Sequence, residues 1–206
     1  MEAKTRKSEA TRAAIVDAAL DIVAESGFGA ISMKAVADRL QLSKSCVFSR
    51  SGSSETLQLA VVEEYGRRFL ADVFLPAMQK PRGLPRLDAV MLRWFERVAS
   101  KADIGGALYE ATAFSLEPVD ANLRAQLVQG VAGWRAMMRR TITQAIDEGH
   151  LKADLDIGLF MYEMHSLVMG ALYEAAFLGD RKAASKGARA YQRLIDSYRP
   201  ERPLSP

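Results

Sequence analysis

The sequence predicts an all-α protein: an N-terminal three-helix domain of the helix-turn-helix type, followed by a larger helical bundle, about nine helices in all. Three observations support this fold class. Apolar residues recur at helical spacing along most of the chain, no segment shows the period of two typical of strands, and Ser, Asp, Gly and Pro stand where helices would begin or end. The 206 residues, 49% of them hydrophobic, suffice for a sizeable core.

The first helix is expected to begin near Glu9 or Thr11 and to end at Gly27, which suits a left-handed C-terminal residue. The preceding residues, Met1 to Glu9, are polar and partly basic, and we expect a loose arm there. The helix carries one apolar face with the spacing i, i+3, i+4, i+7 and i+8: Ile15, Ala18, Ala19, Ile22 and Val23. This face can support the motif that follows it.

The stretch from Ser32 to Leu57 has the pattern of a helix-turn-helix. Ser32 and Ser43 can each cap a short helix, because a serine hydroxyl accepts a hydrogen bond from an unpaired N–H of the first turn. The first short helix has one apolar stripe: Met33, Val36, Ala37 and Leu40. In the second, three residues can face the first helix: Leu42, Cys46 and Val47. Four others then point away from it: Lys44, Ser45, Phe48 and Ser49.

The charge of this stretch is more positive than that of the rest of the chain. Residues 32–54 hold four basic residues, Lys34, Arg39, Lys44 and Arg50, against the single acidic Asp38, which is a net charge of +3. The whole chain is also +3, so the remainder is neutral. A local basic surface on a balanced protein is the electrostatic pattern expected for contact with a phosphate backbone.

Six further helices are expected after the motif, at about 53–75, 84–98, 104–116, 120–148, 156–179 and 181–198. In the first of these, apolar residues recur every four positions from Leu57 to Val73, so this helix is long enough to leave the small domain and enter the next one. Pro76 marks its end or a kink. The tract 155–178 is apolar on more than one face, which suits a helix with its own core on one side and a partner subunit on the other.

Residues 11–61 resemble the N-terminal domain of TetR-type transcriptional regulators, and the helical remainder resembles the regulatory domain of that family more loosely. The matching residues are Thr11, Arg12, Ile15, Ala18, Ala19, Leu20, Gly27, Phe28, Ser32, Met33, Val36, Ala37, Leu42, Ser43, Lys44, Phe48, Ser53, Leu57, Ala60 and Val61. The chain departs from the family pattern at several positions. Gln41 stands for a usual Gly, Phe48 for Tyr, Arg50 and Ser51 for a common His-Phe pair, and Ser54 for a usual Lys.

The motif and the resemblance together imply a set of DNA contacts. Lys44 and Ser45 open the second short helix, whose N-terminal residues meet base edges in the major groove. The serines at the helix starts present backbone N–H groups to phosphate, and Arg50 supplies the charge that Ser54 does not. The expected DNA-binding residues are Ser32, Ser43, Lys44, Ser45, Phe48, Ser49, Arg50 and Ser54.

The resemblance also implies two domains, residues 1–52 for DNA binding and residues 53–206 for ligand binding and dimerisation. Nine Met residues suit an adaptable apolar interior, so the expected effector is a small apolar or amphipathic molecule. The expected ligand-binding residues are Trp94, Tyr109, Phe114, Trp134, Met138, Met161 and His165. The last two helices of the resembled family form its dimer interface, and the residues expected there are Tyr162, Met169, Leu172 and Tyr173.

Other classes of protein find little support. The two His residues and the single Cys46 form no metal-ligand spacing or catalytic arrangement, so we expect no enzyme activity, no metal and no cofactor. The absence of a secretory signal or an uninterrupted apolar span favours a cytoplasmic protein without a membrane partner. The expected function is therefore a ligand-responsive regulator, most simply a repressor, that binds a palindromic double-stranded DNA operator as a homodimer. The alternative is an all-helical dimeric interaction protein that does not bind DNA.

Overall fold

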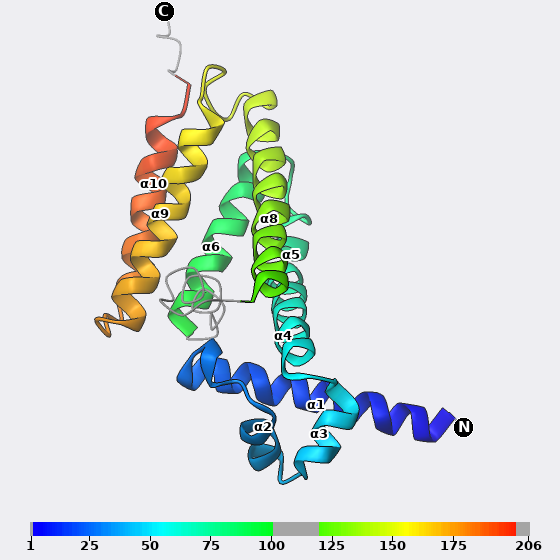
Figure 1. Ribbon diagram of the computed structural model, residues 1–206. Coiled ribbons are helices and arrows are strands. Elements are labelled where there is room, and N and C mark those ends of the chain that lie inside the picture. Colours follow the sequence, from blue (N-terminus) through cyan, green and yellow to red (C-terminus); the bar gives the residue numbers. More distant parts are fainter. Residues whose placement is uncertain (1, 101–119, 201–206) are drawn as a thin grey trace, which may run out of the picture. The chain divides into compact units, whose positions relative to one another are not determined.

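The computed structural model describes residues 2–100 and 120–200, and every regular element in these ranges is helical (Figure 1). The N-terminal elements are α1 (Glu2–Ser26), the 3-10 turn η1 (Phe28–Ala30), α2 (Met33–Leu40), α3 (Lys44–Ser51) and α4 (Ser54–Phe69). The π-helix η2 (Leu70–Phe74) and α5 (Leu75–Ala77) continue α4 without a break. Then come α6 (Leu84–Ser100), α8 (Ala121–Asp147), α9 (Ile157–Ala176) and α10 (Ala183–Ser197).

The all-α prediction is confirmed. The described residues form eight helices when α4, η2 and α5 are taken as one, against about nine expected. The expected helix at 104–116 lies outside the described residues. No described helix is both long enough and apolar enough to cross a membrane.

The described chain forms two compact units. The first contains residues up to Arg68 and the start of α8, residues 121–130, and the second contains residues 69–100 and 131–200. The junction between the units therefore falls inside continuous helices, at Arg68–Phe69 in α4 and at residues 130–131 in α8.

In the first unit α1 packs against both α2 and α3. Its expected apolar face is buried, and Val36, Val47 and Leu57 from the three following helices are fully buried in the same unit. The helix begins at Glu2 rather than near Glu9, so the expected loose arm is wrong: it is helical. The physical reason is composition, because residues 2–10 hold no Gly or Pro and are rich in Ala, Glu, Lys and Arg, which favour helices.

Acidic residues of α1 hold two arginines of other helices in this unit. The Arg39 guanidinium of α2 donates to both carboxylate oxygens of Glu25, at 2.8 and 2.5 Å. Arg68 of α4 donates to Asp17 and also to Glu64, one turn earlier in its own helix, at 2.8 Å. These ion pairs fix the direction in which α2 and α4 leave α1.

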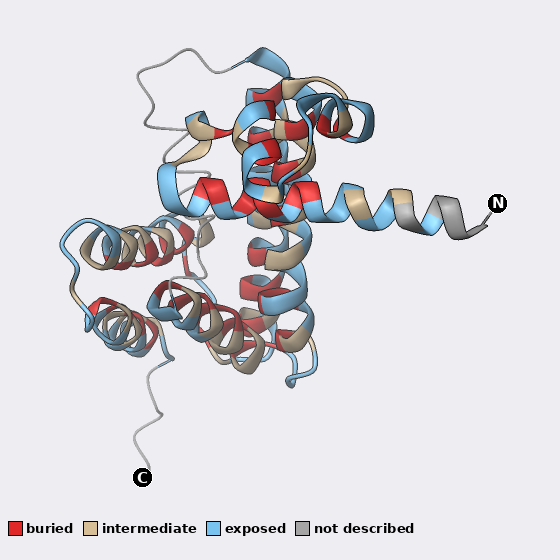
Figure 2. Ribbon diagram, turned by 90° about the horizontal axis from the view of Figure 1, so that it is seen from below, coloured by how far each residue is buried: buried red, intermediate tan, exposed pale blue. Residues whose placement is uncertain are grey.

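The second unit packs α6, α9 and α10 around one core, with α9 and α10 side by side (Figure 1). Buried residues line the facing sides of these helices (Figure 2). The Tyr191 hydroxyl of α10 donates to Asp88 of α6 at 2.8 Å, and burial raises the pKa of the Asp88 carboxyl. At Gly187, an added Cβ would lie 2.5 Å from Phe95 Cε1, so α10 approaches α6 as closely as it does because this residue has no side chain.

The change from α4 to η2 has a local cause. Pro76 has no N–H, so the Asp72 carbonyl four residues earlier loses its ordinary helical donor. Arg93 of α6 donates to that carbonyl oxygen instead, at 3.3 Å. The Leu75 N–H bonds to the Leu70 carbonyl, five residues back, which is the π-helical pattern. The expected kink or end at Pro76 is therefore a π-helical segment that is bound to α6.

Candidate functional site

Serines cap both short helices of the motif as expected. Ser32 Oγ accepts from the Ala35 N–H at 3.1 Å and begins α2, and Ser43 Oγ accepts from the Cys46 N–H at 3.2 Å and begins α3. Gln41, between them, is the only described residue other than glycine with a positive φ, 55°. This left-handed conformation explains why glycine suits the position better, since glycine adopts it without a Cβ penalty.

One face of α3 packs inward and the other is open to solvent. Val47 is fully buried, and Met33, Val36 and Ala37 of α2 are buried opposite it. The outward residues are the four expected from spacing: Lys44, Ser45, Phe48 and Ser49. Phe48 is 59% exposed, which is unusual for a phenylalanine, so this face offers both an apolar ring and polar groups to a partner.

The serine hydroxyls of this face differ in their partners. Ser49 donates to the Cys46 carbonyl at 2.9 Å, and Ser45 lies 3.0 Å from the Ser43 hydroxyl. At the next helix start, Ser53 rather than Ser54 is the cap, since Ser53 Oγ accepts from the Thr56 N–H at 3.2 Å. Ser54 is the first residue of α4 and is partly buried.

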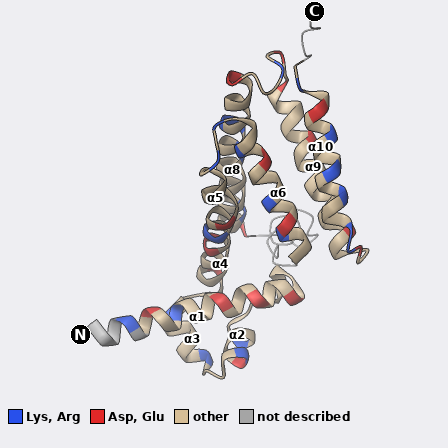
Figure 3. Cartoon of the chain, turned by 180° about the vertical axis from the view of Figure 1, so that it is seen from behind, with Lys and Arg blue, Asp and Glu red and all other residues tan. Residues whose placement is uncertain are grey.

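The structure shows which basic residues of the motif are neutralised by a nearby carboxylate and which are not. Arg39 is paired with Glu25, whose pKa is lowered by the hydrogen bonds from Arg39, and Lys34 lies 3.5 Å from Asp38. Lys44 and Arg50 have no carboxylate partner among the described residues, and Arg50 donates only to the uncharged Ser8 hydroxyl. Figure 3 shows the acidic residues along α1, which the charge count over residues 32–54 could not include. The uncompensated charge therefore lies on α3.

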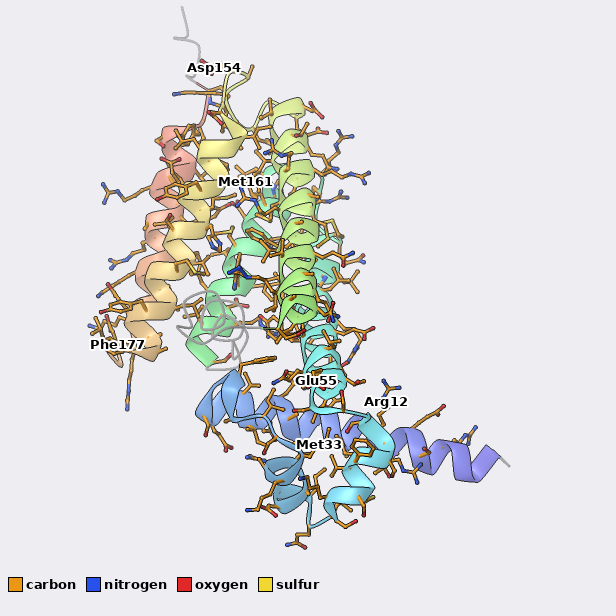
Figure 4. The ribbon with its side chains drawn as sticks, in the orientation of Figure 1. Arg12, Met33, Glu55, Asp154, Met161 and Phe177 are labelled. Atoms are coloured by element: carbon orange, nitrogen blue, oxygen red, sulfur yellow. The ribbon has the colours of Figure 1, made fainter. Side chains whose placement is uncertain are left out.

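Three of the expected ligand-binding residues form one cluster in the second unit. The Trp94 and Trp134 rings meet edge to face with their centroids 5.0 Å apart, and His165 lies 5.7 Å from Trp134 and 6.2 Å from Trp94. Met138 and Met161 are buried in the core of the same unit, and Figure 4 shows Met161 pointing inward from α9. Tyr109 and Phe114 lie outside the described residues.

The cluster includes two residues that the sequence did not single out. The Phe69 ring, at the end of α4, packs edge to face on Trp94 at 5.3 Å, and the Arg97 guanidinium lies 5.7 Å above the Phe69 ring. Arg97 also donates to Asp72 of η2 at 2.5 Å. These contacts join residues of α6 to residues of α4 and η2, which are distant from α6 in the sequence. No local sequence pattern therefore predicts them.

The residues expected at a dimer interface fall into two groups. Tyr162 and Tyr173 of α9 are 68% and 57% exposed, whereas Met169 and Leu172 are partly buried and pack against the core of their own protomer. Phe177, one turn after Tyr173, is 75% exposed and points away from the bundle (Figure 4). The exposed apolar face of α9 contains Leu159, Tyr162 and Tyr173, and it is continued by Phe177 and Leu178 directly after the helix. Extending the helical spacing beyond Tyr173 would have found Phe177.

Metal ligation finds no support in the described residues, where no three His, Cys, Asp or Glu side chains are close enough to share an ion.

Comparisons with known proteins place the chain in a family. The model of the tetracycline repressor-like C-terminal domain matches residues 83–191, more than half of the chain. No curated protein sequence matches. Solved structures share the fold: a TetR-family regulator from Cytophaga hutchinsonii has a TM-score of 0.77 and 17% identity, with 95% of this chain and 98% of that chain covered.

Two further structures have named functions. The transcriptional regulator FadR from Bacillus subtilis, solved with stearoyl-CoA, has a TM-score of 0.71 at 17% identity, covering 88% of this chain and 96% of its own. The ketosteroid regulator of Mycobacterium tuberculosis has a TM-score of 0.64 at 16% identity, covering 93% and 96%. At these identities the structures establish the fold alone. With the match over residues 83–191, the resemblance seen in residues 11–61 is confirmed, and the chain belongs to the TetR family of transcriptional regulators.

Proposed function

We propose that the protein is a ligand-responsive repressor that binds a palindromic operator as a homodimer. Residues 1–52 form the DNA-binding domain, and residues 53–206 form the ligand-binding and dimerisation domain. The observation that carries the proposal is the outward face of α3, where Lys44, Ser45, Phe48 and Ser49 are exposed and where Lys44 and Arg50 are the motif's uncompensated charges. In a helix-turn-helix this second helix lies in the major groove.

Binding to the DNA upstream of the protein's own gene tests this reading. Fluorescence anisotropy at several stated salt concentrations should show tighter binding to one upstream site than to random DNA of the same length. Lys44→Ala should cost about 1–3 kcal/mol at that site and relax the preference at one base position. Equal affinity for both DNAs would support the alternative, a dimeric interaction protein without a DNA role.

Arg50→Ala and Arg39→Ala are matched variants, because each removes one arginine from the motif. Arg50→Ala should weaken binding to all sequences alike and lower the salt slope by about one per subunit, because an uncompensated charge is removed. Arg39→Ala should leave the salt slope unchanged, since Glu25 already balances that guanidinium. A slope that responds equally to both changes would contradict the assignment of Arg50 to phosphate.

Dimerisation is assigned to the exposed apolar face of α9. Tyr173→Asp should convert the dimer to a monomer, because a buried unpaired charge at an interface costs several kcal/mol, in order of magnitude. Tyr173 is a sharper test than Met169 or Leu172, which also pack within their own protomer. Sedimentation at micromolar concentration measures the oligomeric state of both proteins. A wild-type protein that sediments as a monomer would contradict the proposal.

The effector is proposed to be apolar or amphipathic and to bind in the second unit. The aromatic and Met residues of this unit support that choice, as does the B. subtilis FadR structure, whose stearoyl-CoA contains a long apolar chain. Binding should change the separation of the two α3 helices, which must match one DNA turn of about 34–36 Å. Helix α4 is the link, because Phe69 at its end contacts Trp94. Induction is refuted if no compound that binds this unit alters operator affinity.

A further inference from the structure

Two ring nitrogens of the aromatic cluster are buried and have no hydrogen-bond partner among the described residues. They are Nε1 of Trp134 and Nδ1 of His165. The two rings are neighbours, with centroids 5.7 Å apart, and Trp94 contacts both. Buried polar groups in native proteins are nearly always paired, because each has given up its hydrogen bonds to water. Two such atoms in adjacent rings therefore point to a partner outside the described residues, and a bound ligand is one that both could share.

The hydrogen-bonding chemistry of the two atoms defines that partner. The indole Nε1 is only a donor, so it needs an acceptor. Burial, and secondarily the charge of Arg135, lowers the pKa of His165, so its imidazole is neutral near pH 7. In the tautomer with its proton on Nε2, Nδ1 is an acceptor and needs a donor. A hydroxyl group supplies both functions at once, whereas an ether or a carboxylate only accepts.

The surrounding charges favour an uncharged partner. Arg97, the cation that packs against Phe69 in this cluster, is already paired with Asp72 at 2.5 Å. Arg135, on α8, has an exposed side chain and is solvated. Trp94 and Trp134 belong to or pack against a hydrophobic core in which the buried residues are apolar. A carboxylate would lose its hydration here without gaining a dedicated buried cation.

We propose that His165 carries its proton on Nε2, and that Trp134 Nε1 and His165 Nδ1 together bind the hydroxyl group of an uncharged apolar effector, an alcohol or a phenol. This inference rests on the proposed function, and it adds the chemical class of the effector and the two atoms that select it. The same cluster is joined by ring contacts to the last residue of α4: His165 and Trp134 touch Trp94, and Trp94 touches Phe69. A ligand held by Trp134 and His165 is thus two ring contacts from α4.

Tryptophan fluorescence measures binding directly, because the chain has two tryptophans and both lie in this cluster. The probes are matched pairs that differ only in the hydroxyl: decanol with its methyl ether, and para-butylphenol with its methyl ether, together with decanoate. For at least one pair, the hydroxyl compound should bind about tenfold more tightly than the ether, which is the effect of one net hydrogen bond. Calorimetry repeats each titration without relying on the fluorophores.

Three variants identify the side chains that cause the preference for the hydroxyl compound over its ether. His165→Phe should bring the ratio of hydroxyl to ether affinity to about one, because the ether lacks only the hydrogen bond donated to Nδ1, whereas Trp134→Phe should weaken the binding of both compounds and keep the ratio. Trp94→Phe makes the same chemical change one ring away and should keep the ratio. Without ligand, His165→Phe should melt no lower than the wild type, because a buried polar ring without a hydrogen-bond partner is replaced by an apolar ring of similar size. A lower melting temperature for this variant would show that the imidazole is structural and would overturn the inference.

Three other results would also count against the proposal. Absence of a hydroxyl preference in every pair, tighter binding of decanoate than of decanol, or a preference that survives His165→Phe would each overturn the proposal. Operator affinity of the ligand-free protein is measured on the same preparations. Intact operator binding with no hydroxyl preference refutes this inference alone, whereas loss of specific operator binding in the wild type refutes the proposed function.

Discussion

Gly187 allows the close contact between α10, α6 and α9, and replacing it tests the packing of the second unit. A Cβ at this position would lie 2.5 and 2.9 Å from Cε1 and Cδ1 of Phe95, and 3.2 Å from the Ala171 Cβ. Carbon atoms in a protein core normally approach no closer than about 3.5 Å. Gly187→Ala therefore requires the Phe95 ring or α10 to move.

The expected change in the free energy of unfolding is the sum of two opposing contributions. Overpacking of a core typically costs about 1–3 kcal/mol, while Ala in place of Gly within a helix contributes about 1 kcal/mol. Gly66, in the interior of α4, is the matched control, since a Cβ there would meet nothing within 4 Å. Gly66→Ala should gain the helix term alone, so the free energy of unfolding of Gly187→Ala should be lower by about 1–3 kcal/mol than that of Gly66→Ala.

Urea denaturation measures both variants, at one fixed protomer concentration because dimerisation adds to apparent stability. Each variant is compared with the wild type under identical conditions. If Gly187→Ala is as stable as Gly66→Ala, the contact of α10 with Phe95 does not limit the packing, and the reasoning fails.

Two further predictions concern the first unit. Gln41→Gly should raise the free energy of unfolding by about 0.5–1 kcal/mol, because Gly relieves the left-handed strain at φ 55°, and a decrease in a urea titration would contradict this. The hydrogen bonds from Arg67, and then those from Arg68, lower the pKa of Glu64 from 4.5 to about 2, so its contribution is present above pH 4.5 and is lost as the pH falls toward 2. Glu64→Gln should therefore be less stable than the wild type by about 1–2 kcal/mol at pH 7, after allowance for the exposed arginines, and the difference should vanish near pH 2. A difference that does not change with pH would refute the carboxylate's role.

Local rules were enough to place most helices and their ends. Caps act within one turn, so Ser32 and Ser43 could be identified as helix starts from residue type alone, and the structure confirms both bonds. Spacing likewise showed that the 155–178 tract is apolar on more than one face. In the structure Met161, Met164 and Val168 are buried on one face, and Tyr162 and Tyr173 are exposed on another.

The sequence by itself thus determined the fold class, the motif and the face of α3 that is exposed to solvent, because each follows from interactions between residues a few positions apart. Only the tertiary structure decided which charges remain free, because Glu25 neutralises Arg39 from a different helix. It also decided where α4 changes to π-helical geometry, since that depends on Pro76 and on a bond from Arg93 in α6. The meeting of Phe69, Trp94, Trp134 and His165 is likewise invisible in the sequence, because contacts between distant segments are set by how helices pack rather than by local periodicity.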